Sequence, residues 1–88
     1  MADWRVDNAR NLRGQRLRRQ KWAKPSEEWD HDHCEACMTK FAEFDGPDFQ
    51  HEGYAACEEY PRGASYAWVC LRCFDELHVE MGWTAAKD

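Results

Sequence analysis

The clearest alternation of apolar and polar positions lies near the C-terminus and predicts a helix after Cys70. Three apolar residues recur there at intervals of three and four positions, the spacing of one helical face; they are Phe74, Leu77 and Met81. Charged residues occupy the other faces, and Gly82 is placed as a C-terminal cap. Trp83 is then positioned to fold back onto this helix.

Two aromatic-rich segments in the middle of the chain predict a β-hairpin between Glu52 and Cys70. The first segment covers residues 53–60 and the second covers residues 65–69. The turn residues 61–64, which include Pro61 and Gly63, separate them. We expect this hairpin to lead directly into the C-terminal helix.

The N-terminal segment has a weaker pattern, with Leu12, Leu17 and Trp22 spaced by five residues. This spacing fits neither a helix nor a strand well. We favour a strand within residues 12–22, because Gly14 weakens a helix. Pro25 ends any helix or strand that precedes it.

A third apolar set, Met38, Phe41 and Phe44, recurs at every third residue. This spacing predicts a short helix that ends near residues 45–47, where Gly46 and Pro47 follow an aspartate.

With 88 residues, the chain is small enough that folding usually needs a metal, a disulfide or a partner as an additional constraint. Its 43% hydrophobic residues and five tryptophans argue against disorder. We expect most tryptophans to fill the core and at least one to be exposed at a binding surface. No apolar run is long enough to span a bilayer and the N-terminus has no apolar signal segment, so we expect a cytosolic protein.

The five cysteines indicate metal binding, because disulfides are uncommon in a reducing compartment and an odd number cannot all pair. Four of them form two Cys-x2-Cys pairs, separated by 32 residues: Cys34, Cys37, Cys70 and Cys73. Each two-residue spacer lets a tight turn direct two thiolates at one ion, and two such turns complete a tetrahedron. We predict one structural Zn²⁺, with a rubredoxin-like iron site as the alternative.

Four further residues are potential ligands of a second site or substitutes in the first: His31, His33, His51 and Cys57. We favour structural roles for them. His33 beside the first cysteine pair is placed to hydrogen-bond a thiolate, and Cys57 is a small apolar residue on a predicted strand.

The net charge of −5 is unevenly distributed. Residues 1–24 carry eight basic and two acidic groups, whereas the other 64 residues carry four basic and 15 acidic groups. We therefore divide the chain into a basic N-terminal arm, residues 1–25, packed on a four-cysteine metal-binding domain, residues 26–88. The acidic body favours basic protein partners, and the arm either contacts phosphate or docks on its own domain.

The order of cysteine knuckle, hairpin, second cysteine pair and helix resembles a treble-clef or zinc-ribbon-like finger over residues 34–82. The resemblance implies a small metal-stabilised α+β fold whose final pair lies at a helix N-terminus, where the macrodipole stabilises thiolates. The glycine that often follows a knuckle's second cysteine is absent, since Met38 and Phe74 stand at those positions.

The segment Asp30-His31-Asp32-His33 resembles the metal-and-base motif of treble-clef nucleases of the His-Asn-His type. It departs from that motif because it precedes the first cysteine pair and no Asn-His partner follows on a helix. No phosphate-binding loop or nucleophile elbow is present either. We expect no enzymatic activity, and a His-Asn-His-like nuclease is kept as an alternative function.

The chain as a whole resembles small bacterial four-cysteine zinc-finger proteins of unassigned role, some of which are toxin-neutralising immunity proteins. This resemblance implies a protein-binding module with a basic partner. The candidate contacts are Asp45, Asp48, Glu58 and Glu59, with exposed Trp or Tyr residues. The alternative is a nucleic-acid-binding finger that uses Trp22 for stacking and a basic set for phosphate contacts: Arg13, Arg16, Arg18, Arg19 and Lys21.

Overall fold

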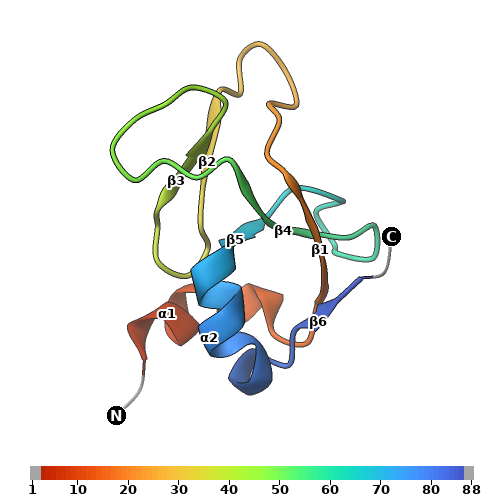
Figure 1. Ribbon diagram of the computed structural model, residues 1–88. Helices are drawn as coiled ribbons and strands as arrows, with labels where there is room; N and C mark the ends of the chain where they lie inside the picture. Colours follow the sequence, from red (N-terminus) through yellow and green to blue (C-terminus); the bar gives the residue numbers. More distant parts are fainter. Residues whose placement is uncertain (1–2, 87–88) are drawn as a thin grey trace.

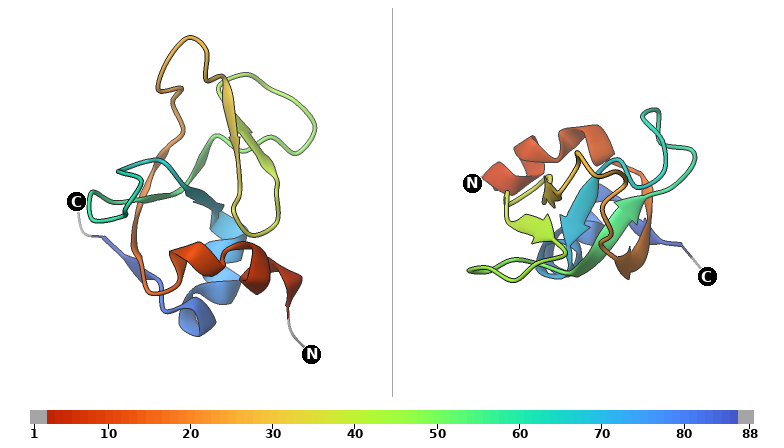
Figure 2. Two further views of the ribbon diagram at one scale, coloured as in Figure 1. Left: turned by 180° about the vertical axis from the view of Figure 1, so that it is seen from behind. Right: turned by 90° about the horizontal axis from the view of Figure 1, so that it is seen from above.

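The computed structural model describes residues 3–86, and their helices and strands follow one another as shown in Figure 1. The helical elements are α1 (Trp4–Asn8), the 3₁₀ helix η1 (Arg10–Leu12) and α2 (Leu71–Met81). The strands are β1 (Arg16–Lys21), β2 (His31–His33), β3 (Lys40–Ala42), β4 (Glu52–Ala56), β5 (Trp68–Cys70) and β6 (Thr84–Ala85). The two α-helices lie together at one end of the molecule, and the long loops after β1 and β3 lie at the other (Figures 1 and 2). The fold is α+β, as the sequence predicts.

The main sheet has four strands in the order β5-β4-β1-β6. The strand expected between residues 12 and 22 is present as β1, which pairs antiparallel with β4 and parallel with β6. Leu17 is fully buried, whereas Arg16, Arg19 and Lys21 are exposed. The basic strand therefore lies inside the sheet and presents its charged side chains to solvent.

The predicted hairpin is present as β4 and β5, which pair antiparallel from Gly53 opposite Cys70 to Ala55 opposite Trp68. Its connection is longer than the four-residue turn predicted from Pro61 to Ala64, since β4 ends at Ala56 and β5 begins at Trp68. Cys57 and Tyr60 are buried, so this part of the chain turns into the core and does not continue the strand.

The short helix predicted from Met38, Phe41 and Phe44 is wrong, because residues 40–42 form β3, which pairs antiparallel with β2. Only Phe41 of the three is buried, and its ring lies 5.4 Å from that of Trp68. Met38 and Phe44 are 57% and 49% exposed. The three side chains do not share one buried face, and backbone pairing with β2 decides the local structure.

The C-terminal helix is confirmed as α2, with three predicted residues buried on one face: Phe74, Leu77 and Met81. It ends at Gly82, whose φ of 71° is the left-handed conformation of a C-terminal cap. Trp83 then folds back, so that its ring stacks on Phe74 at 6.1 Å. Its indole nitrogen donates a hydrogen bond to the Leu12 carbonyl at 2.9 Å, which joins the C-terminal segment to η1.

The tryptophans divide between core and surface. Trp22, Trp68 and Trp83 are at most 4% exposed, whereas Trp4 and Trp29 are 59% and 39% exposed. Most of the tryptophans therefore fill the core, as expected for a chain this small. None of the helices within residues 3–86 has the length and apolar character needed to cross a membrane.

Candidate metal centre

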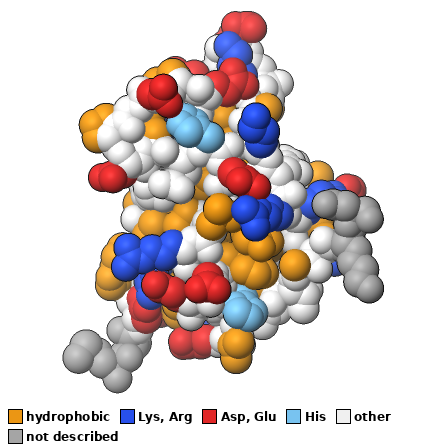
Figure 3. All heavy atoms as spheres, in the orientation of Figure 1, with side chains coloured by type: hydrophobic (Ala, Val, Ile, Leu, Met, Phe, Trp, Pro, Cys, Tyr) orange, Lys and Arg blue, Asp and Glu red, His pale blue; other side chains and the backbone are white. Residues whose placement is uncertain are grey.

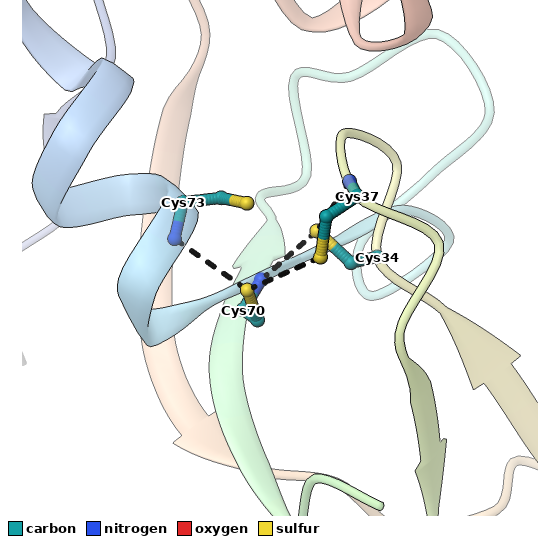
Figure 4. Close-up of side chains that lie close together, drawn as sticks. All are labelled: Cys34, Cys37, Cys70 and Cys73. Atoms are coloured by element: carbon teal, nitrogen blue, oxygen red, sulfur yellow. Dashed lines mark hydrogen bonds between the residues drawn. The ribbon is translucent and has the colours of Figure 1, made fainter. Parts of the chain in front are cut away.

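The four cysteines of the two Cys-x2-Cys pairs converge on one point between the β2–β3 connection and the start of α2 (Figure 4). Their sulfur atoms all lie within 4.8 Å of one another, and those of Cys37 and Cys70 are 3.7 Å apart. Four sulfurs around Zn²⁺ at about 2.3 Å are separated by about 3.8 Å in a regular tetrahedron. None of the cysteines is in a disulfide. The set therefore fits a tetrahedral metal ion.

The first pair lies at the tip of the β2–β3 hairpin. The Cys34 amide donates to the Thr39 carbonyl at 2.8 Å, and the Met38 amide donates to the Cys34 carbonyl at 2.9 Å. The Cys37 amide points at the Cys34 sulfur at 3.5 Å. Met38 has a φ of 69°, the left-handed conformation that a glycine usually adopts at this position. The turn therefore forms without glycine, but with a strained methionine.

Replacing Met38 with glycine is expected to stabilise the metal-loaded protein by about 0.5–1 kcal/mol. The left-handed conformation costs a non-glycine residue about 1–2 kcal/mol, part of which the greater freedom of glycine in the unfolded chain offsets. Little packing is lost, because Met38 is 57% exposed. Thermal unfolding measures the gain, with Met38→Ala as the matched control. If the Gly and Ala variants are equally stable, the backbone at position 38 is not strained.

The second pair lies where β5 passes into α2. Cys70 is the N-cap of α2, and its sulfur accepts a hydrogen bond from the Cys73 amide at 3.5 Å. This confirms the expectation that the final pair lies at a helix N-terminus, where the macrodipole favours negative charge. Phe74 needs no left-handed turn because the chain is already helical there.

Backbone contacts join the two halves of the centre. The Cys70 amide donates to the Cys34 sulfur at 3.3 Å, and the Glu35 amide donates to the Trp68 carbonyl at 2.8 Å. Cys34, Cys70 and Cys73 are at most 5% exposed, and only Cys37 is half-buried. Four ligands complete a tetrahedron and leave no open position for a substrate. The four cysteines therefore form a closed set of ligands.

Electrostatics also favour a cation at this point. Hydrogen bonding from the thiols of Cys34 and Cys73 lowers the pKa of Cys70 to about 4. The same thiol cluster, through Cys34 and Cys70, and burial raise the pKa of Cys73 above its ordinary value. The cluster therefore favours a thiolate at Cys70 but opposes a second thiolate at Cys73. A positive ion bound between them removes this repulsion. Such an ion binds only as the remaining protons leave.

Arg5 lies beside the centre, and no pattern in the sequence indicates this position. Its guanidinium lies 3.8 Å from the Cys73 sulfur and forms ion pairs with Glu76 at 2.6 Å and Asp3 at 2.7 Å. On the same short helix, Asn8 donates to the Ala36 carbonyl of the knuckle at 2.9 Å. Helix α1 therefore supports both cysteine pairs.

Replacing Arg5 with glutamine is expected to weaken metal binding by about 10- to 100-fold, the usual effect of losing a group that orients a metal ligand. The reason is that the variant loses the charged donor beside Cys73 and the ion pair with Glu76 that holds α1 against α2. Competition with a zinc chelator measures the affinity. Arg10→Gln on the exposed side of the same segment is the matched control, since the one hydrogen bond of the Arg10 side chain within residues 3–86 is to the Asp7 carbonyl. Equal affinities of the two variants would contradict this role.

The other predicted ligands do not form a second histidine-containing site. Within residues 3–86, groups of three or more potential ligands occur at the four cysteines and at Cys57, Glu58 and Glu59, and neither includes a histidine. His31 instead pairs with Asp30 at 2.7 Å, and His33 is exposed. Cys57 is fully buried, as expected for a small apolar residue.

The basic strand is paired with acidic groups of the neighbouring segment. Arg16 contacts Glu59 at 3.1 Å, Arg18 contacts Glu58 at 3.3 Å, and Arg19 contacts Glu52 at 2.8 Å. The guanidinium of Arg19 lowers the pKa of Glu52, and that of Arg16 lowers the pKa of Glu59. Acidic and basic side chains are also interspersed on the face that Figure 3 shows. Part of the basic arm therefore docks on its own acidic body.

Comparisons of the chain with protein-family models, with curated proteins and with solved structures found no match. The structure itself shows the architecture, which is a knuckle, a β-hairpin and a C-terminal helix around four cysteines.

Proposed function

We propose that this protein is a non-enzymatic, zinc-stabilised protein-binding module, and that it acts as an immunity protein that neutralises a cognate bacterial toxin. The observation that carries the proposal is the closed cysteine cluster. Three of its four cysteines are at most 5% exposed. An ion held there by four thiolates has no position for a substrate, so its role is to hold the fold together. The function then belongs to the surface that this fold presents.

The side chains at that surface favour a protein partner over a nucleic acid. Three arginines of β1 already form ion pairs with glutamates of the same chain: Arg16, Arg18 and Arg19. Binding to phosphates would have to compete with these pairs. Exposed aromatic side chains favour protein recognition instead, because Trp and Tyr are common at interface hot spots; they include Trp29 and Tyr66.

The net charge of −5 favours a basic toxin, which the acidic surface would steer into contact before the chain covers its active site. The structure changes which carboxylates suit this role. Glu58 and Glu59 lie within ion pairs, whereas Asp48 is exposed and forms no ion pair with another residue of 3–86. Asp45, which contacts His51 at 3.1 Å, is also exposed.

Co-expression tests this function. The chain is produced together with a growth-inhibiting protein encoded beside its own gene, and growth is measured. The wild type is expected to restore growth and to form a complex with that protein in size-exclusion chromatography. A Cys73→Ser variant, which we expect not to fold, is the negative control. Failure of the folded, zinc-loaded wild type both to restore growth and to form a complex would contradict the proposal.

The acidic surface is tested separately with purified proteins. Reversing two exposed charges, Asp45→Lys with Asp48→Lys, is expected to slow association with the toxin and to reduce its dependence on salt. Asp75→Lys with Glu80→Lys on the exposed side of α2 is the matched control, because it changes the net charge by the same amount. If all three proteins associate at the same rate, steering by this surface is wrong.

A further inference from the structure

A surface hollow with a volume of about 410 Å³ lies beside the cysteine knuckle. The residues that matter for its chemistry come from the loop after β1, from β2, from the knuckle and from the β4–β5 connection; they are Trp29, Asp32, Glu35, Met38 and Tyr66. We name it the Trp29–Tyr66 hollow. Its wall includes the knuckle itself, so its shape depends on the folded metal centre.

The aromatic part of this hollow is a pair of exposed rings. Trp29 and Tyr66 are 39% and 41% exposed, and their rings meet edge to face at 6.1 Å. Two such rings offer a π-face to a cation and a rigid apolar surface to its alkyl stem.

The acidic part consists of two carboxylates without a basic partner. Neither Asp32 nor Glu35 forms an ion pair with another residue of 3–86. No lysine or arginine lines this hollow; its basic residues are His31 and His33, and the ring of His31 pairs with Asp30 instead. Asp32 is held in place because one of its oxygens accepts a hydrogen bond from the Trp22 indole at 2.9 Å. Aromatic rings and unpaired carboxylates in one hollow are complementary to a positively charged side chain.

An arginine of the chain itself shows which cation suits these rings. The Arg62 guanidinium lies 5.3 Å from the centre of the Tyr66 ring, and it donates a hydrogen bond to the Tyr66 hydroxyl at 3.2 Å. Arg62 lines the neighbouring hollow, which shares Trp29, Asp32 and Tyr66 with the larger one. A planar guanidinium both stacks on aromatic rings and forms forked hydrogen bonds with carboxylates, which an ammonium group does less well.

From these observations we infer that the Trp29–Tyr66 hollow receives an arginine side chain of the partner protein. Its guanidinium packs against the two aromatic rings and pairs with Asp32 and Glu35. The inference rests on the proposed protein-binding function and specifies the chemistry of the partner. Because Glu35 and Met38 belong to the knuckle, removal of the metal also removes the hollow.

A peptide titration tests the hollow directly. The full zinc-loaded chain is titrated with a capped Gly-Arg-Gly-Arg-Gly peptide, and backbone amide and indole resonances are followed by NMR. We expect the largest shifts at the Trp29 indole and the Glu35 amide. A peptide with citrulline in place of arginine keeps the shape without the charge, and it is expected to bind at least about tenfold more weakly. Shifts centred elsewhere, or equal binding of both peptides, would overturn the inference.

Matched variants locate the binding residues. Trp29→Ala and Glu35→Gln are each expected to weaken peptide binding by about tenfold, the effect of losing an interface anchor. Trp4→Ala and Glu80→Gln, which remove an exposed tryptophan and an exposed carboxylate outside the hollow, are expected to leave it unchanged. Bound zinc is measured in each variant to show that the fold is intact. Equal affinities in all four variants would also overturn the inference.

Growth rescue by the same variants separates this inference from the proposed function. If the wild type restores growth and Trp29→Ala and Glu35→Gln do not, both hold. If all variants restore growth equally, the hollow is not the contact, although the protein-binding function stands. If the wild type neither restores growth nor forms a complex, the proposed function is wrong, and the peptide titration alone decides whether the hollow binds arginine.

Discussion

Replacing Cys73 with serine is expected to abolish folding, which we expect to see as the loss of dispersed NMR amide signals and of the circular dichroism of α2. Cys73 is 1% exposed, and its sulfur lies with three others within 4.8 Å. Structural Zn²⁺ contributes an apparent 10–16 kcal/mol in small zinc domains, on the order of the whole stability of a domain, about 5–15 kcal/mol. Loss of one thiolate therefore removes most of the free energy that folds this chain.

Cys57 provides the matched control, because it is fully buried but lies outside the four-cysteine cluster. A Cys57→Ala variant should fold and bind one metal ion, with a loss of about 1 kcal/mol for the small cavity. If Cys73→Ser remains folded, or if the two variants lose the same stability, the cysteine cluster is not what holds the fold together.

The second large effect is expected on acidification, which should release the metal and unfold the chain. The pKa of Cys70 falls in the folded chain from an ordinary value of 9.0 to about 4. A depressed pKa contributes stability that is complete above the ordinary pKa and is lost as the pH falls through the folded value. For the metal-free cluster this loss falls between about pH 9 and about pH 4. In the metal-loaded chain protons compete with the ion for the thiolates, so its stability should also decrease as the pH falls. Urea unfolding at a series of pH values measures this dependence.

Zinc binding should also release the Cys73 proton near neutral pH, because the pKa of this thiol is raised in the metal-free cluster. Calorimetric titration in buffers with different ionisation enthalpies detects that release as a buffer-dependent heat of binding. A heat that does not depend on the buffer, or a stability that rises on acidification, would contradict this account of the centre.

The features that the sequence predicts well are those encoded locally. Helix α2 follows from three apolar residues at helical spacing and a glycine cap, and the β4–β5 hairpin follows from two aromatic-rich segments around a turn. The cysteine cluster follows from two matching spacings. In each case a few neighbouring residues are enough to specify the geometry.

The features that the sequence does not predict depend on contacts between distant segments. Residues 38–44 have helical spacing, but β3 forms because it pairs with β2 and buries Phe41 against Trp68. Helix α1 spans only five residues, too few for a periodic signal, and Asp3 caps it. Arg5 reaches Cys73 across 68 positions of the chain. Tertiary packing decides all three.

Charge asymmetry is an intermediate case. The counts alone indicate a basic arm and an acidic body, with the arm either free for phosphate or docked on the body. The alignment of β1 with β4 decides between these alternatives for three arginines, because it places Arg19 beside Glu52 and brings Arg16 and Arg18 to the glutamates just beyond β4. Composition supplied the charges, but strand register determined their partners.

The most direct test of the central claim is X-ray absorption spectroscopy at the metal edge of the purified full chain, combined with elemental analysis. We predict one Zn²⁺ per chain, bound by four sulfur atoms at about 2.3 Å. A folded chain that contains no metal, or a metal with ligands other than four sulfurs, would contradict it.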